Sequence, residues 1–189
     1  MRSRSIWILP AFCAAALAAA SGDYFSAKHK FELIESENLR SGSRVVLTPA
    51  ELNAYVAEEA PAAFPDGVRD VRVSLAGPGL VQGAAIVDFG KLRRAQGNPP
   101  GWLMSKLLNG DRAVRVTARL SSAGGRGRVD LQEAQVAGIA LDGEALEFVI
   151  HTFLLPAYPG AVVGQPFELG HRIEKIDVMP SGVGILIGR

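Results

Sequence analysis

The sequence has a single cysteine, Cys13, which lies in an apolar stretch near the start of the chain. A thiol nucleophile, a disulfide framework and a thiolate metal site are therefore all excluded for the residues that follow it. The three histidines, His29, His151 and His171, are widely spaced and form no His-x-x-x-His pair. A zinc site would have to be completed by carboxylates that the fold brings together. We predict no metal and no cofactor.

The motifs of common enzyme classes are also missing. There is no Walker sequence, and no serine lies in a Gly-x-Ser-x-Gly elbow. The two glycine-rich pieces, 77–79 and 124–127, lack the glycine spacing of a dinucleotide-binding loop and do not join a strand to a helix. They are predicted to be hairpin turns. No residue is therefore assigned a catalytic role.

The chain opens with two cations, Arg2 and Arg4, and continues with an apolar run up to Ala20. The run is short and rich in alanine, and Ala18 and Ala20 occupy the small positions of an A-x-A cleavage site, which is typical of a secretory signal peptide. We predict cleavage near Ala20 and a secreted or periplasmic protein. The alternative is an uncleaved N-terminal segment that anchors the chain at a membrane.

This interpretation divides the chain into a signal peptide (1–20), a flexible N-terminal tether (21–43) and one α+β domain (44–189). Cleavage would lower Lys+Arg from 20 to 18 against 19 Asp+Glu, so the net charge would become about −1. A balanced charge of this kind attracts neither nucleic acid nor anionic lipid to the surface as a whole. We therefore expect no nucleic-acid partner.

Apolar and polar residues alternate with a period of two from Ala113 to Val136, around a glycine-rich turn at 121–127. This pattern predicts two paired strands with one buried face. In the second strand the apolar positions shift between Leu131 and Ala134, which indicates a bulge of one extra residue.

Two more hairpins are expected, around turns at 76–79 and 179–182. The segment 80–89 is apolar on both faces, so we expect it to be a central strand or to be covered on both sides. A short strand is expected at 45–47. Because hairpins dominate and no βαβ glycine pattern occurs, the predicted fold is α+β: a curved antiparallel sheet of hairpins packed on two or three amphipathic helices in a single domain.

The first helix of the domain has a clear start signal. Thr48 can cap the helix, Pro49 suits the first helical position, and Glu51 lies three residues after the cap. An apolar stripe then runs from Leu52 to Ala60, and Pro61 is expected to end the helix.

Two later segments are more apolar than helices that cover one face of a small sheet need to be. One spans 102–108, and the other, capped by Asp142, spans 146–155. They could close a dry core, or they could line a groove for an acyl chain or another hydrophobic ligand. The residues predicted to line that groove are Trp102, Leu103, Leu107, Leu146, Val149, Ile150, Phe153 and Leu154.

Five arginines form the densest basic group, and they could bind a phosphate or lipid headgroup or could simply belong to a solvated sheet face with acids nearby. They are Arg112, Arg115, Arg119, Arg126 and Arg128.

The motifs at 47–53 (Leu-Thr-Pro-Ala-Glu-Leu-Asn), 138–141 (Gly-Ile-Ala-Leu) and 165–169 (Gln-Pro-Phe-Glu-Leu) resemble those of exported bacterial proteins of unknown function with a Leu-Thr-x-x-Glu-Leu-Asn helix start. Several such families are thought to have a tubular lipid-binding (TULIP-like) or related curved-sheet fold. The resemblance implies strands that wrap an apolar helix, and it assigns no catalytic residue. Because a full tubular domain is usually longer, we expect a half-open groove or no cavity.

The preferred hypothesis is a non-enzymatic domain that binds a lipid or other hydrophobic ligand between sheet and helices, with membrane-surface contact as a further option. The alternative is an envelope structural or interaction module, which a long exposed edge strand such as 183–187 would favour. A lipid hydrolase is the third hypothesis, and it would need a serine or carboxylate beside a histidine, His151 or His171, in the groove.

Overall fold

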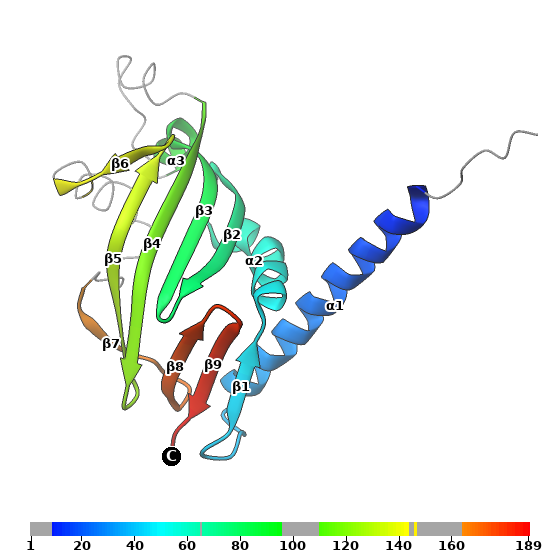
Figure 1. Cartoon of the computed structure of the whole chain (residues 1–189), viewed down its shortest axis with the longest axis vertical. Helices are drawn as coiled ribbons and strands as arrows, with labels where there is room; N and C mark the ends of the chain where they lie inside the picture. The colour runs from blue at the N-terminus through cyan, green and yellow to red at the C-terminus, as the bar shows by residue number, and fades with distance from the viewer. Residues whose placement is uncertain (1–8, 65, 96–109, 144–145, 147–163) are drawn as a thin grey trace, which may run out of the picture.

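The computed structural model describes residues 9–64, 66–95, 110–143, 146 and 164–189 (Figure 1). The described residues form helices and antiparallel strands, so the predicted α+β class with an antiparallel sheet is confirmed. In chain order the elements are α1 (Leu9–Glu35), β1 (Arg44–Leu47), α2 (Pro49–Ala63), β2 (Val68–Gly77), β3 (Leu80–Asp88), α3 (Phe89–Ala95), β4 (Asp111–Ala123), β5 (Arg126–Val136), β6 (Ile139–Leu141), β7 (Pro166–Glu168), β8 (Ile173–Met179) and β9 (Gly182–Ile187).

The strands form two sheets rather than the one that we predicted. The larger sheet has the order β2-β3-β4-β5-β6, with β7 also paired to β5, and the smaller sheet has the order β1-β9-β8. The last hairpin, β8–β9, belongs to the small sheet because β9 pairs with β1, where Leu47 lies opposite Val183. Strand β9 is therefore the centre of the small sheet, and the suggestion that 183–187 is an exposed edge is wrong.

The hairpin β4–β5 has the predicted bulge. Thr117 pairs with Glu133 and Ala118 with Leu131, so Gln132 is the extra residue. Because of the bulge, the apolar side chains before and after Gln132 lie on the same face of the sheet. Strand β3 lies between β2 and β4, which confirms its predicted central position.

Helix α2 begins with the predicted capping box, since Thr48 and Glu51 bond reciprocally through side chain and backbone. The predicted end at Pro61 is wrong, because the helix continues to Ala63 and the Phe64 amide still donates to the Ala60 carbonyl (2.9 Å). Proline removes only one backbone donor, and in the last turn of a helix few bonds remain to be disrupted.

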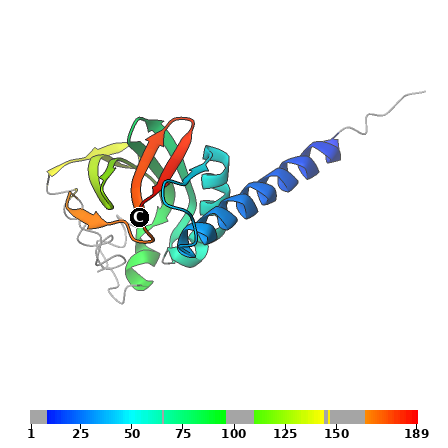
Figure 2. The same cartoon turned by 90° about the horizontal axis from the view of Figure 1, so that it is seen from below.

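Helix α1 replaces most of the expected tether. It is continuous up to Glu35, and Ala27 and Ile34 on it are buried in a hydrophobic cluster with Leu47 and Ile185. Ala27, Phe31 and Ile34 fall on one helical face, which is enough to pack the helix, whereas Phe25 and Leu33 are exposed. Figure 2 shows the N-terminal half of α1 extending beyond the sheets. Within the described residues, no helix combines the length and the apolar character needed to cross a bilayer.

Strand β8 joins the two sheets along its edge away from β9. The Gly79 amide donates to the Val178 carbonyl (2.9 Å), and the Gly125 amide donates to the Glu174 carbonyl (2.9 Å). Between them, the Ser122 hydroxyl accepts a hydrogen bond from the Ile176 amide (2.7 Å) and donates to the Ile176 carbonyl (2.8 Å). The hairpin ends of the large sheet thus satisfy a strand edge that would otherwise be open.

Candidate functional site

Seven of the eight residues predicted to line a groove lie outside the described residues, as do the predicted helix at 102–108 and all of the predicted helix at 146–155 except its first residue. The exception is Leu146, which is half-buried. Its amide donates to the Asp142 carbonyl (3.3 Å), as expected for a helical turn that starts at Asp142. The described candidate site lies on the sheet that these segments connect.

The large sheet has one almost wholly apolar face, and we call it the apolar face. The strand register places apolar residues of β2, β3, β4 and β5 beside one another on this side. They are Val68, Val73, Leu75, Val81, Gly83, Ala85, Val87, Val114, Val116, Ala118, Leu120, Val129, Leu131, Ala134 and Val136.

Only one end of the apolar face carries a fully buried cluster in the described part of the chain. There Val87, Phe89 and Leu92 are buried at the β3–α3 junction. Further along the strands Ala134 is also buried (5% exposed), whereas residues such as Val81 and Val116 stay partly exposed. The face therefore retains accessible apolar surface.

Among the described residues, no atom covers Gly83 at the centre of the apolar face. Register places Gly83 between Val73 on β2 and Val116 on β4. A Cβ atom added at Gly83 would meet no atom of the described residues within 4 Å. A glycine in the middle of a strand usually weakens it, and it often marks a place where a ligand or another backbone comes close.

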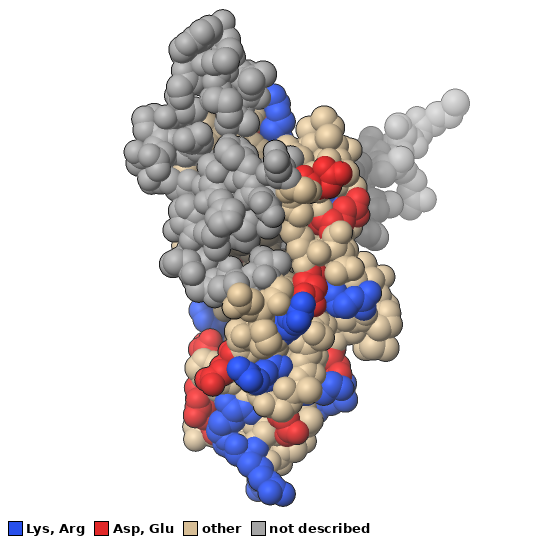
Figure 3. Space-filling view, turned by 90° about the vertical axis from the view of Figure 1, so that its left-hand side faces the viewer, with Lys and Arg blue, Asp and Glu red and all other residues tan. Residues whose placement is uncertain are grey.

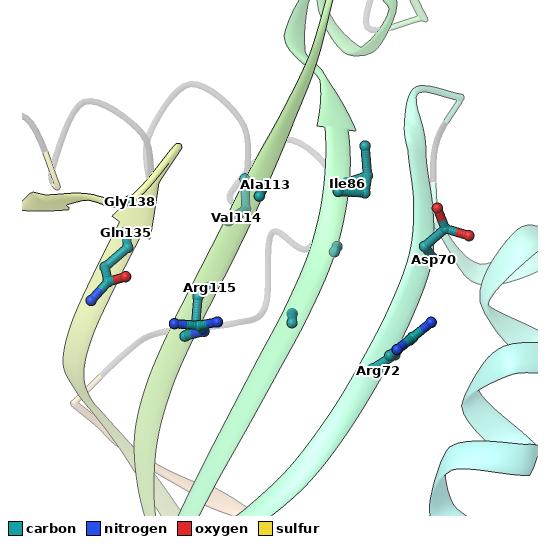
Figure 4. Close-up of a pocket in the computed structure, with 10 residues that line it drawn as sticks. Asp70, Arg72, Ile86, Ala113, Val114, Arg115, Gln135 and Gly138 are labelled. Atoms are coloured by element: carbon teal, nitrogen blue, oxygen red, sulfur yellow. The ribbon is translucent and has the colours of Figure 1, made fainter.

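The opposite side of the large sheet is polar, and we call it the polar face. It contains a hollow of about 500 Å³ between β2 and β5 (Figure 4), the polar-face hollow. Its lining consists of Asp70, Arg72, Ala84, Ala85, Ile86, Ala113, Val114, Arg115, Gln135 and Gly138. Ala84 and Ala113 are short, so they leave room between the longer side chains around them.

The five arginines that form the densest basic group of the sequence do not form one patch. Register places Arg115, Arg119 and Arg128 on the polar face with Arg126, whereas Arg112 is on the other side. Arg128 is already paired with Asp130 (2.7 Å). In the face drawn in Figure 3, basic and acidic side chains intermix. Most of these arginines therefore fit one of the two predicted alternatives, a solvated sheet face with acids nearby.

The one charged side chain buried among the described residues is that of Glu51, which is 5% exposed. Its Oε1 accepts hydrogen bonds from Ser26 Oγ (2.5 Å) and Lys30 Nζ (2.5 Å) on α1, and its Oε2 accepts one from the Thr48 amide (2.8 Å). Burial alone would raise the pKa of Glu51, but these hydrogen bonds lower it to about 2. The carboxylate is fully occupied, so it ties α1 to α2 rather than serving as an acid or base.

One of the two described histidines, His171, has a carboxylate beside it. His171 Nδ1 lies 3.5 Å from Glu37 Oε1, and both side chains are about half exposed. His29 is exposed on α1, and His151 lies outside the described residues. No group of three or more metal-ligating side chains occurs among the residues that the structure places.

Comparison of the chain with protein-family models, with curated proteins and with solved structures found no match. The two faces of the large sheet are thus the features on which a functional proposal must rest.

Sequence reasoning missed the polar-face hollow because its two arginines come from separate hairpins. Arg72 precedes the turn at 76–79, and Arg115 belongs to the next hairpin. The signal that could have found the pair is the register: Ala84 faces both arginines once β3 is placed between β2 and β4.

Proposed function

We propose that the protein is a non-enzymatic domain that binds a lipid or another apolar ligand against the apolar face of the large sheet. The observation that carries this proposal is the open space at Gly83, in the middle of partly exposed valines. The two apolar segments 102–108 and 146–155 support it, because both belong to connections of this sheet, between α3 and β4 and between β6 and β7. They would form the other wall of the groove.

The energy of such binding would come from burial of methylene groups, each of which contributes about 0.8 kcal/mol. Ten buried methylenes would contribute about 8 kcal/mol before the cost of ordering the chain is subtracted. A long acyl chain can therefore bind usefully without any specific polar contact.

The proposal includes export to the periplasm or the cell exterior, with an N-terminal membrane anchor as the alternative. The apolar run up to Ala20 supports it. The resemblance of the 47–53 motif to TULIP-like exported proteins supports a lipid ligand, in a groove that is half open rather than a closed tunnel.

The test compares two valine substitutions at neighbouring residues of β3. Gly83→Val would fill the open space on the apolar face, whereas Ala84→Val would place the same side chain on the polar face. We expect Gly83→Val to weaken fatty-acid and phospholipid binding by about tenfold or more and to leave the thermal midpoint equal or higher, since valine favours strands. Ala84→Val should leave fatty-acid binding unchanged.

Binding is measured by the fluorescence of Trp102, isolated with Trp7→Phe because the chain has two tryptophans. Organic extraction and mass spectrometry of the purified protein give a second readout. An absence of co-purifying lipid, with no fluorescence change on titration, would refute the proposal. That result would favour an envelope interaction module whose apolar segments only fill its core.

A further inference from the structure

We propose that the polar-face hollow is a binding site for a phosphate group. The inference concerns the opposite side of the sheet from the apolar ligand and does not depend on it. The hollow has a floor of small side chains, Ala84 and Ala113, and an arginine on either side of that floor. Figure 4 shows Arg72 on β2 and Arg115 on β4, with β3 between them.

Register fixes this arrangement. Arg72 and Arg115 both lie opposite Ala84, so their backbones are two strand spacings apart, or about 10 Å. Both side chains are exposed, and neither forms a hydrogen bond or an ion pair with any described residue. Two long cations that have no partner among the described residues can therefore turn toward one anion above Ala84.

The carboxylates nearby are already engaged. Asp70 Oδ2 lies 2.7 Å from Arg69 Nη1, and the same guanidinium also reaches Asp111 (2.6 Å). Glu133, on the same face of β5, accepts a hydrogen bond from Gln135 Nε2 (2.7 Å). Arg72 and Arg115 thus contribute positive charge that the adjacent acids do not neutralise through direct pairs.

The chemistry of two guanidinium groups on either side of a floor of small side chains favours phosphate. Each presents a planar fork of donors, and a tetrahedral phosphate can offer oxygens to both forks at once. A hollow of about 500 Å³ is larger than a phosphate ion, so it has room for the alcohol to which the phosphate is esterified. That ester can be a soluble phosphomonoester or the headgroup of a phospholipid.

The experiment follows the amide signals of Ala84 and Arg115 by NMR while inorganic phosphate is added to the full chain at constant ionic strength. We expect saturable shifts at these strands. The double variant Arg72→Gln/Arg115→Gln should bind about tenfold more weakly or worse, with an unchanged thermal midpoint. The matched control is Arg119→Gln, which removes an arginine from the same face of β4 and should bind like the unmodified protein.

Co-sedimentation with vesicles distinguishes the two sources of phosphate. Binding to phosphatidylglycerol vesicles but not to phosphatidylcholine vesicles, lost in the double variant, would support the inference with a lipid headgroup as ligand. Phosphate-dependent shifts without vesicle binding would support it with a soluble ester. No saturable shift together with no vesicle binding would overturn it, as would an equal loss in Arg119→Gln.

The two proposals fail independently. Ala84→Val should block phosphate and spare lipid chains, whereas Gly83→Val should do the reverse.

Discussion

Because the hydrogen bonds of Glu51 join α1 to α2, we predict that the protein loses stability in acid. The pKa of Glu51 falls from 4.5 to about 2 in the folded protein. Each pKa unit corresponds to about 1.4 kcal/mol, so ionised Glu51 stabilises the fold by about 3 kcal/mol. Because the folded pKa is the lower one, this contribution is complete above pH 4.5 and is lost as the pH falls toward 2.

The perturbation is Glu51→Gln, with Glu58→Gln on the exposed side of α2 as the matched control. We expect Glu51→Gln to lower the free energy of unfolding at pH 7 by about 3 kcal/mol, since Lys30 then loses its carboxylate partner. Between pH 5 and pH 2, the unmodified protein and Glu58→Gln should lose more stability than Glu51→Gln does.

The assay is urea denaturation across this pH range, followed by circular dichroism at 222 nm. Circular dichroism at this wavelength reports on the helices that Glu51 joins. Equal stability of the two variants at pH 7, with parallel pH dependence, would refute the reasoning, because it would mean that the buried carboxylate does not hold α1 in place.

Two further predictions concern packing. Ser122→Ala removes the hydroxyl that accepts a hydrogen bond from the Ile176 amide, so it should lower the free energy of unfolding by about 1–3 kcal/mol. Its control, Ser121→Ala on the polar face, should change the free energy of unfolding by less than about 0.5 kcal/mol. Urea denaturation measures both. Ala27→Leu overfills a site that is 0% exposed, so it should lower the free energy of unfolding by about 1–3 kcal/mol in the same assay. Phe25→Ala changes a side chain that is 66% exposed and should lower the free energy of unfolding far less. Equal effects within either pair would contradict the packing described here.

The hairpins could be predicted from the sequence because their signals are local. Alternation and turn glycines fix β2–β3, β4–β5 and β8–β9, and even the bulge at Gln132 follows from the spacing of apolar residues. The start of α2 at Thr48 is equally local, since all three signals lie within four residues.

The features that could not be predicted depend on contacts between distant segments. Strand β7 has three residues and forms only because Phe167 pairs with Gly127 on β5. The separate small sheet needs β1 and β9, which are more than a hundred residues apart. The packing of α1 depends on contacts of Ala27 and Ile34 with Leu47 and Ile185, which lie on other elements of the chain.

The candidate site could be predicted only in part. Sequence pattern indicated surplus apolar surface on the connections of the large sheet. It could not show that Gly83 leaves a space at the centre of the apolar face, because that depends on how three strands align. It also gave no reason to pair Arg72 with Arg115.

The most direct test of the central claim is mass spectrometry of lipids extracted from the purified protein and from Gly83→Val, prepared side by side. We predict a stoichiometric apolar ligand in the unmodified protein and its loss in the variant, with both chains folded. An equal amount of ligand in both, or none in either, would contradict the claim that the apolar face binds it.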